Sequence, residues 1–425
     1  MIDILNGRDV TADAVLLARA DEVPDVTRDV AEILEQVRQK GDAALAEYTR
    51  KFDGVSIENL KVSGEEVEAA LAEVDGAFMD ILRQAAENIR DFHQRQVRQG
   101  FVVAERPGVV MGQKIRPIER VGVYVPGGTA AYPSTVLMDA IPAKVAGVEK
   151  IVMVTPPGKD GRVDAGILAA AHIAGVGEIY KVGGAQAIAA LAYGTATVPK
   201  VDKIVGPGNL YVATAKKMLY GAVDIDMIAG PSDVLVVADE TAKPAQIAAD
   251  MLAQAEHDAN AAAVLVTTSA ALAEAVDKEL ERQLPLLPRE QIARASIQKN
   301  GRIIVVETID SALEMANALA PEHLELCVED PFSLLPQVKN AGSIFLGHNT
   351  PEALGDYFAG PNHTLPTGGT ARFYSPLSVD DFIKKSSYLY YSKAALAEVS
   401  DKVIGFAKKE GLDAHARSVE IRKNE

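Results

Sequence analysis

The sequence predicts an α/β protein with two Rossmann-like parallel-sheet domains, an N-terminal helical portion and a C-terminal helical tail. Short β-branched runs begin at residue 121 and recur at intervals of roughly 25 to 30 residues, with Ala-rich helical stretches between them. Two such blocks follow one another along the chain. This alternation is typical of βαβ units, whose strands are parallel.

The first hundred residues are predicted to be mostly helical. Residues 25–40 carry apolar side chains at helical spacing and end at Gly41, a residue that favours a helix C-terminus. Residues 63–96 show the same periodicity and open with Ser63-Gly64-Glu65-Glu66, the pattern of a capping box. The short segment before these helices, residues 1–23, is expected to form a separate arm.

The first α/β block contains four predicted strands, Val121–Val125, Lys150–Val154, Glu178–Val182 and Lys203–Val205. Pro142 lies in the helical stretch after the first of them and should kink or shorten that helix. The second block contains five predicted strands, Val234–Ala238, Ala262–Thr267, Arg302–Val306, Leu324–Val328 and Ser343–Leu346. A loop rich in glycine, proline and threonine follows at 356–372, and a helical tail is expected from about residue 379.

Composition and charge narrow the class of protein. The 425 residues include 43 basic and 59 acidic ones, and the net charge of −16 argues against a nucleic acid or an anionic membrane as partner. The single cysteine, Cys327, excludes an intrachain disulfide and a thiolate metal cage. No signal peptide and no bilayer-length apolar stretch is recognisable, so a soluble, cytoplasmic protein is expected.

Three glycine-containing turns follow predicted strands of the first block. They are Pro126-Gly127-Gly128, Gly183-Gly184 and Gly206-Pro207-Gly208-Asn209. Parallel sheets bind ligands at the carboxyl ends of their strands, and glycine lets the backbone approach a phosphate closely. The standard dinucleotide fingerprint G-x-G-x-x-G is absent. The turns therefore either bind phosphates or serve chain geometry alone.

Several histidines have neighbours that suit metal binding or acid–base chemistry. Gln254 and His257 share one helical face if the helix persists, and their oxygen and nitrogen atoms suit Zn²⁺; a solvated helix end is the alternative. Glu322 and His323 precede an apolar strand, where they form either an acid–base pair or a charged loop.

Two more pairs lie further along the chain. Asp356 and His363 belong to the glycine-rich loop, and functional residues concentrate on loops. Glu410 and His415 flank a glycine in the tail, where a histidine is more often incidental. From these residues alone, a metal-dependent hydrolase fits nearly as well as a dehydrogenase.

Successive blocks of the sequence resemble, in order, the motifs of the histidinol dehydrogenase family. The resemblance runs from roughly residue 20 to residue 420, and several blocks are long and unusual in composition. The blocks are Val123-Tyr124-Val125-Pro126-Gly127-Gly128, Gly183-Gly184-Ala185-Gln186-Ala187-Ile188, Gly206-Pro207-Gly208-Asn209, Ala229-Gly230-Pro231-Ser232, Gln254-Ala255-Glu256-His257, Pro321-Glu322-His323-Leu324-Glu325, and Gly355-Asp356-Tyr357 with Gly360-Pro361-Asn362-His363-Thr364-Leu365-Pro366-Thr367.

The resemblance implies an enzyme that uses NAD and zinc to oxidise L-histidinol to L-histidine. The reaction proceeds through L-histidinal in two hydride transfers and completes histidine biosynthesis. An alternative is a related zinc- and NAD-dependent dehydrogenase of another small polar alcohol, and a metal-dependent hydrolase is a more distant one.

The resemblance also implies a role for each site residue. The implied zinc ligands, one ion per subunit, are Gln254, His257, Asp356 and His415. The implied NAD contacts are Tyr124, Gln186 and Asn209. The implied substrate contacts are Ser232, Gln254, His257, His323, Asp356, His363, Glu410 and His415. His323 is the implied base for the alcohol, and Glu322 is the implied residue that activates the water needed for the aldehyde.

Finally, the resemblance implies a homodimer in which the C-terminal tail, with Glu410 and His415, completes the site of the neighbouring subunit. It implies a discontinuous first α/β domain of residues 24–123 and 233–377. A second, nucleotide-binding domain of residues 124–232 and a tail of residues 378–425 complete the expected organisation.

Overall fold

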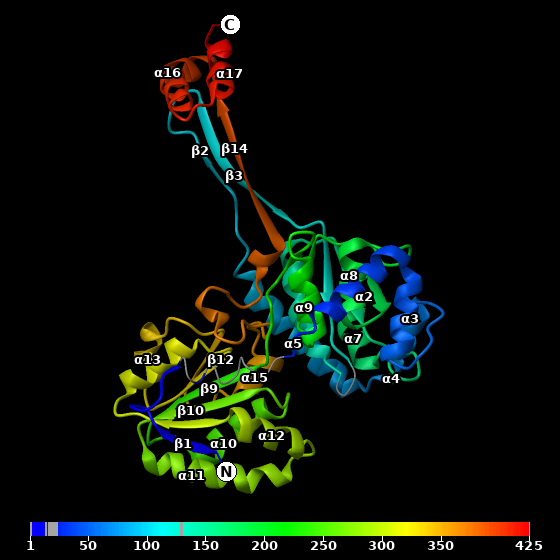
Figure 1. Ribbon diagram of the computed structural model, residues 1–425, viewed down its shortest axis with the longest axis vertical. Helices are drawn as coiled ribbons and strands as arrows, with labels where there is room; N and C mark the ends of the chain where they lie inside the picture. Colours follow the sequence, from blue (N-terminus) through cyan, green and yellow to red (C-terminus); the bar gives the residue numbers. More distant parts are fainter. Residues whose placement is uncertain (1, 13–14, 16–23, 128–130, 425) are drawn as a thin grey trace. The chain divides into compact units, whose positions relative to one another are not determined.

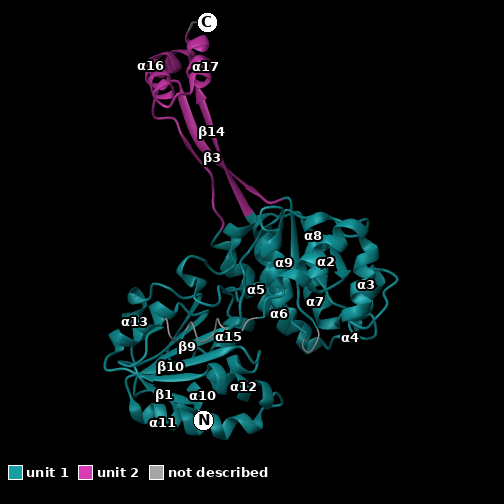
Figure 2. Cartoon of the chain, viewed as in Figure 1, with its two compact units in different colours: residues 1–96, 119–382 teal, residues 97–118, 383–425 magenta. Residues whose placement is uncertain are grey.

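The computed structural model describes residues 2–12, 15, 24–127 and 131–424. The chain divides into two compact units (Figure 2). Unit 1 comprises residues 1–96 and 119–382, and unit 2 comprises residues 97–118 and 383–425. No described helix reaches the length and apolarity that crossing a membrane requires.

Unit 1 contains a six-stranded sheet in which every neighbouring pair of strands is parallel (Figure 1). Its strands are, in sheet order, β1 (Asp3–Asn6), β11 (Arg302–Val305), β10 (Ala262–Thr267), β9 (Asp233–Ala238), β12 (His323–Cys327) and β13 (Ser343–Leu346). The helices packed against it are α10 (Pro244–Ala255), α11 (Ala270–Gln283), α12 (Glu290–Asn300) and α13 (Ile309–Leu319). The strands β9, β10 and β12 are buried at every residue, as expected for a parallel sheet covered on both faces.

Unit 1 also contains a five-stranded parallel sheet. Its strands are, in sheet order, β6 (Glu178–Lys181), β5 (Lys150–Thr155), β4 (Arg120–Tyr124), β7 (Lys203–Val205) and β8 (Asp224–Ile225). The helices that connect its strands are α6 (Pro133–Ala146), α7 (Ala165–Ala174), α8 (Gly184–Tyr193) and α9 (Leu210–Leu219). The two sheets confirm the predicted α/β class with parallel sheets.

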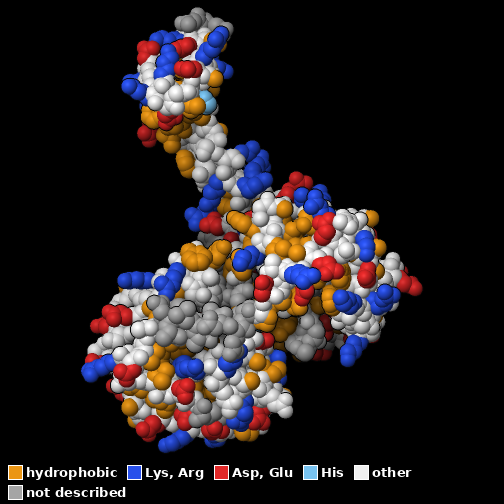
Figure 3. Space-filling view, viewed as in Figure 1, with side chains coloured by type: hydrophobic (Ala, Val, Ile, Leu, Met, Phe, Trp, Pro, Cys, Tyr) orange, Lys and Arg blue, Asp and Glu red, His pale blue; other side chains and the backbone are white. Residues whose placement is uncertain are grey.

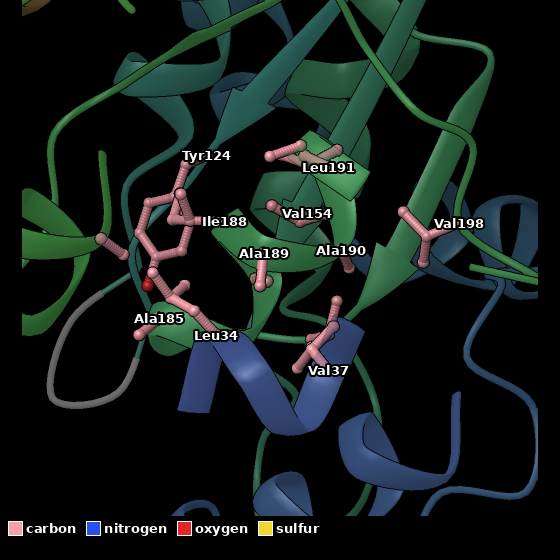
Figure 4. Packing of buried hydrophobic residues seen from close by; sticks show 14 of the residues in the cluster. Leu34, Val37, Tyr124, Val154, Ala185, Ile188, Ala189, Ala190, Leu191 and Val198 are labelled. Atoms are coloured by element: carbon pink, nitrogen blue, oxygen red, sulfur yellow. The ribbon is translucent and has the colours of Figure 1, made fainter. Parts of the chain in front are cut away.

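The N-terminal helices pack on the helices that cover the five-stranded sheet. They are α2 (Thr27–Lys40), α3 (Asp42–Phe52), α4 (Gly64–Glu73) and α5 (Gly76–Gln94). Helix α2 contacts α8 and α9, α4 contacts α7, and α5 contacts α6. Figure 4 shows why α2 lies there: Leu34 and Val37 point into the same core as Ala185 and Ile188 of α8.

The apolar stripe of α2, a helix expected to group with residues 233–377, is buried in the core around the five-stranded sheet. The expected arm also contributes to a sheet, since β1 pairs in parallel with β11. The boundaries of the four expected domains otherwise stay a prediction.

Three local expectations need correction. The helix expected over 63–96 is two helices, because Val74 is extended and the Asp75 side chain accepts a hydrogen bond from Phe78 N at 2.9 Å, which caps a new helix. Of the two effects expected of Pro142, a kink or a shorter helix, the second is wrong, because α6 continues past it to Ala146. The tail expected to be helical from about residue 379 instead forms a strand over 383–391 before its helices begin.

Unit 2 consists of an antiparallel three-stranded sheet and two helices. The strands are, in sheet order, β14 (Ile383–Tyr391), β3 (Val109–Pro117) and β2 (Phe101–Val103), and the helices are α16 (Lys393–Lys409) and α17 (Asp413–Asn424). Strand β14 pairs with β3 along its whole length, from Ile383 opposite Pro117 to Tyr391 opposite Val109. The partner strand is some 270 positions earlier in the chain, so no local pattern predicted this pairing.

Candidate active site

Titratable side chains gather at the amino-terminal ends of β9 and β12, in the middle of the six-stranded sheet. Asp233 begins β9, and Glu322 and His323 lie at the start of β12, the neighbouring strand. Helix α10 returns antiparallel to β9, so its last turn, with Gln254, lies at the same end of the sheet. Helix α15 (Glu352–Tyr357) contacts α10 and adds Glu352 and Asp356.

Glu322 is fixed by a reciprocal pair of hydrogen bonds with Asp233. Asp233 N donates to Glu322 Oε2 at 3.0 Å, and Glu322 N donates to Asp233 Oδ1 at 2.8 Å. Burial raises the pKa of Glu322 to about 7, against the opposing effect of the His323 charge. A carboxyl group with this pKa can take up and release a proton near neutral pH.

His323 is buried, with one ring nitrogen bonded and the other open. Its Nδ1 lies 3.2 Å from the carbonyl oxygen of Asp233, so Nδ1 carries a proton. Its Nε2 has no hydrogen-bond partner among the described residues and lies 3.5 Å from Asp356 Oδ1. Burial by itself lowers the pKa of His323, but the charges of Glu352, Glu322 and Asp356 outweigh it and raise the pKa well above 6.5.

Three side chains form a candidate metal cluster beside His323. Ligand atoms of His257, Glu352 and Asp356 all lie within 4.8 Å of one another. Burial raises the pKa of Glu352 to about 8, and its Oε2 has no hydrogen-bond partner among the described residues. Burial works against the Asp356 carboxylate too, but the neighbouring His323 ring outweighs it and lowers the pKa of Asp356.

Gln254 is buried next to this cluster. In the orientation that satisfies its neighbours, its amide nitrogen donates to Glu352 Oε1 at 2.7 Å and its oxygen accepts from Asp233 N at 2.7 Å. The side chain thus touches a member of the metal cluster, while its own oxygen is bonded to backbone. The sequence pattern predicted Gln254 as a site residue but missed Glu352 and Asp233. No local motif distinguishes these two residues, which simply follow Pro351 and Ser232 in the chain.

The loop after α15 carries His363 to the same site. His363 Nδ1 lies 2.9 Å from the carbonyl oxygen of Asp356, which leaves Nε2 as the unprotonated nitrogen of the neutral ring. Burial lowers the pKa of His363, which favours this neutral form. Ser232 is half-buried on the loop before β9, and Gly230 N donates to Thr367 Oγ1 at 2.6 Å, so the two loops are joined.

A proline in α6 anchors this loop. Pro142 has no N–H, so the carbonyl oxygen of Met138, one turn earlier, lacks its helical partner. Asn362 Nδ2 donates to that oxygen at 2.6 Å, and Thr364 N donates to Asn362 Oδ1 at 2.8 Å. His363 is therefore held between two anchored neighbours, and the same bond explains how α6 continues past Pro142.

The anchored loop also reaches the turn that begins with Gly206. Thr364 Oγ1 donates to Asp139 Oδ1 at 2.8 Å. Asp139 is fully buried, and burial raises its pKa to about 8. Its other oxygen lies where a Cβ on Gly206 would come within 2.9 Å. Lys216 Nζ donates to Gly206 O at 2.9 Å, so buried polar groups hold the turn on both sides.

The expected nucleotide contacts lie at the carboxyl ends of the five-stranded sheet. Tyr124 ends β4 and is buried, and its hydroxyl accepts a hydrogen bond from Gly184 N at 3.1 Å. Gln186 lies in the first turn of α8, and its buried Oε1 has no partner in the described chain. Asn209 caps α9 by accepting from Tyr211 N at 3.0 Å and Val212 N at 3.2 Å.

Glu410 and His415 belong to unit 2. Glu410 is the C-cap residue that follows α16, His415 lies in the first turn of α17, and both are exposed. Unit 1 thus assembles Glu322, His323, Asp356, Gln254, His257 and His363, whereas these two residues lie in the other unit.

Comparison with known proteins shows to which family a chain with this arrangement is similar. A family model described as histidinol dehydrogenase matches residues 17–423. The histidinol dehydrogenase of Bacillus cereus is 59% identical over 400 residues, which cover 94% of this chain and 93% of that protein. That of Clostridium acetobutylicum is 56% identical over 401 residues, with the same coverage.

A solved structure agrees with this result. The crystal structure of histidinol dehydrogenase from Elizabethkingia anophelis superposes with a TM-score of 0.93 at 39% sequence identity, covering 99% of this chain and 98% of that one. Because the superposition covers 99% of this chain, it includes both parallel sheets and the tail. The chain therefore belongs to the histidinol dehydrogenase family.

Proposed function

We propose that this chain oxidises L-histidinol to L-histidine, through L-histidinal, with two NAD⁺ and one water consumed and two NADH and three protons released. The single observation that carries this proposal is the convergence of Glu322, His323, His257 and Asp356 at one end of the six-stranded sheet. The activity in the relatives' names favours histidinol over another small alcohol and over hydrolysis.

The residues present fit a zinc ion. Zinc binds histidine nitrogen and carboxylate oxygen, and His257 and Asp356 bring both types within 4.8 Å. The unpartnered Oε2 of Glu352 adds negative charge that a cation would offset. We assign Gln254, His257, Asp356 and His415 as the ligands, one ion per subunit, and this requires the Gln254 oxygen to leave Asp233 N. Bound zinc supplies a Lewis acid that anchors and polarises the substrate.

The residues present also fit NAD. Gly183-Gly184 and the turn at Gly206 lie at the carboxyl ends of parallel strands, where such sheets bind nucleotides. The Oε1 atom of Gln186 has no donor in the described chain and can accept a hydrogen bond from a ligand. We assign Tyr124, Gln186 and Asn209 as NAD contacts. Bound NAD⁺ supplies the hydride acceptor for both oxidations.

His323 carries the protons in the first oxidation. The alcohol must lose its hydroxyl proton as hydride leaves the carbon, and Nε2 of the neutral His323 ring accepts it. A bound cation would favour this neutral form, because it would offset the carboxylate charges that raise the pKa of His323. Asp233 holds the other nitrogen through its carbonyl oxygen, which fixes the ring and its tautomer. The carboxylates around the ring stabilise the imidazolium that forms.

Glu322 prepares the second oxidation. The aldehyde must be hydrated before a second hydride can leave, and a carboxylate with a pKa of about 7 can take the proton of the attacking water. His323 then accepts the proton of the hydrate. The Asp233 backbone holds Glu322 in place, so the two bases act from fixed positions on one strand end.

The substrate's amino and imidazole groups need partners of their own. Ser232, His363 and Glu410 are assigned to this task, together with His323 and the zinc ligands. Glu410 and His415 come from unit 2, whose described surface carries exposed apolar side chains of the kind that subunit interfaces bury, among them Phe101, Val102, Leu389 and Phe406 (Figure 3). This supports a homodimer in which unit 2 completes the neighbouring subunit's site.

The stoichiometry of NADH tests the reaction. Zinc-replete protein is given a limiting amount of L-histidinol with excess NAD⁺, and NADH is counted by absorbance. Two NADH per histidinol, lost on chelation and restored by zinc, is the expected result. One NADH would mean that the aldehyde is released, and none would reject histidinol as the substrate.

Subunit mixing tests the shared site. Differently tagged His257→Asn and His415→Asn chains are co-expressed, and the heterodimer is purified through both tags. If the tail acts in the partner, one of its two sites is intact, so about half of the wild-type activity returns. A tail that serves its own subunit leaves both sites damaged and the heterodimer inactive.

A further inference from the structure

The segment after α3 leads to the nucleotide end of the five-stranded sheet. Lys181 N donates to Leu60 O at 2.7 Å, and the two segments run antiparallel at this point. Because Lys181 is the last residue of β6, the residues that precede Leu60 extend beyond the carboxyl end of the sheet. Asp53, which caps α3, lies on this segment, and α3 contacts α8, the helix that begins at Gly184.

Two oxygen acceptors at this end are buried without a donor in the described chain. They are Oδ2 of Asp53 and Oε1 of Gln186. The Gln186 side chain folds over the turn, since a Cβ on Gly184 would come within 2.6 Å of its Oε1. Buried acceptors are normally paired, so both atoms call for a ligand that donates hydrogen bonds.

The Tyr124 hydroxyl lies at the same turn, where it accepts from Gly184 N. Burial raises the pKa of Tyr124 to about 12, and the charge of Asp53 adds to this rise. Burial raises the pKa of Asp53 to about 6, so this group is ionised above neutral pH. One turn therefore has a carboxylate, an amide oxygen and a phenol around it.

Two lysines along this edge already have carboxylate partners. Lys181 Nζ donates to Glu66 Oε1 at 2.8 Å, and Lys61 Nζ lies 3.9 Å from Glu178 Oε2. A phosphate group placed near Asp53 would meet a charge of its own sign, and these two cations are committed to carboxylates. A hydroxyl group would instead provide the donors that Asp53 and Gln186 lack.

We propose that Asp53 accepts hydrogen bonds from the adenosine ribose hydroxyls of NAD and repels the 2′-phosphate of NADP, and so determines cofactor specificity. The inference rests on the proposed function, because it requires a dinucleotide on the turn at Gly184. It uses the general chemistry by which an acidic residue selects a ribose that carries free hydroxyls. Rejection comes from repulsion and from desolvating a phosphate without a partner.

Binding of reduced cofactors tests this assignment without catalysis. Titration of NADH and NADPH fluorescence is done on full-length, zinc-loaded protein without substrate, for wild type, Asp53→Asn and Glu47→Gln. Wild type is expected to prefer NADH. Asp53→Asn keeps the size of the side chain but removes its charge, so NADH should bind about tenfold more weakly and NADPH about tenfold more tightly. Glu47→Gln removes an exposed carboxylate of the same helix and should change neither affinity.

An NADH-to-NADPH preference that Asp53→Asn leaves within about twofold of wild type would overturn the assignment. A second measurement uses wild type alone, so that it remains valid if the variant misfolds. In it, 5′-AMP should displace NADH at least about tenfold better than adenosine 2′,5′-bisphosphate. Equal displacement would overturn the assignment. If wild type bound neither NADH nor NADPH, the proposed function would fail together with this assignment. If wild type binds NADH and only the expected effect of Asp53→Asn is missing, the assignment alone fails.

Discussion

The two parallel sheets of unit 1 present different chemistry at the ends that carry their candidate sites. The six-stranded sheet presents buried titratable side chains at the amino-terminal ends of β9 and β12, and their pKa values are shifted by burial and by one another. The five-stranded sheet presents glycine turns and backbone groups at its carboxyl ends, and buried polar side chains such as Asp139 and Lys216 hold one of these turns. Similar architecture thus serves proton transfer at one place and close backbone approach at the other.

This difference predicts which substitutions each site can tolerate. Side chains at the first site are replaceable without moving backbone, so their loss should remove chemistry and leave the fold. Gly206 at the second site is required by space, because a Cβ there would meet the backbone carbonyl oxygen of Tyr124, so a larger residue must move the backbone itself. The loop that carries His363 joins the two regions, through Asn362 to α6 and through Thr364 and Asp139 toward Gly206.

The largest expected effect is on the chemistry of the first site. Glu322→Gln removes the proposed base for the water while keeping the shape of the side chain. Oxidation of L-histidinal should slow by about 10²–10⁴-fold, the range for loss of general base catalysis, and oxidation of L-histidinol by much less. Single-turnover NADH formation from each substrate measures the two steps separately. Equal losses in both half-reactions would contradict the assigned role.

The next largest expected effect concerns the space around Gly206, at the carboxyl end of the five-stranded sheet. Gly206→Ala places a Cβ within 2.1 Å of the Tyr124 carbonyl oxygen, at a backbone φ of +114°. We expect a loss of about 3 kcal/mol or more in the free energy of unfolding, together with weaker NADH binding. Urea denaturation measures it, with Gly221→Ala as control, since that glycine also has a positive φ but no atom within 4 Å of its Cβ position. Equal destabilisation by both substitutions would show that conformation, not space, matters here.

Protonation of Asp139 links the two regions and should be visible in the pH dependence of stability. Its folded pKa of about 8 lies above the ordinary aspartate value of 3.8, so the unfolded chain releases this proton first and stability falls as pH rises from about 4 to about 8. Asp139→Asn removes this loss, so its advantage over wild type should grow by about 4 kcal/mol between pH 5 and pH 8. Chemical denaturation at both pH values measures it; a constant difference would mean that Asp139 does not titrate in this range.

The smallest expected effect concerns the anchor of the connecting loop. Asn362→Ala leaves the Met138 carbonyl oxygen without a donor and should cost about 1–2 kcal/mol of stability, with a raised KM for L-histidinol because His363 is less fixed. Pro142→Ala restores a backbone N–H one turn from that oxygen. In a double-mutant cycle it should recover part of the stability lost by Asn362→Ala. Strictly additive effects would show that the two residues do not share this carbonyl.

Much of the fold could be predicted from local pattern. The nine strands of the two blocks were predicted from β-branched runs, and the structure confirms each of them within two residues at either end. The strands β1, β2, β3, β8 and β14 were missed, because their pairing or exposure decides them rather than an apolar run of their own. The break at Asp75 was missed although the residue is a good helix cap, since apolar periodicity continues across it.

The sequence by itself determined which residue types were available for chemistry: Glu322 beside His323, Gln254 three before His257, and glycines after strands. Only the tertiary structure decided which of them meet. Asp233 and Glu352 entered the site because β9 lies beside β12 and α15 lies against α10, contacts between segments far apart in the chain. The shifted pKa values of Glu322 and Asp139 likewise follow from burial, which depends on packing and not on neighbours in sequence.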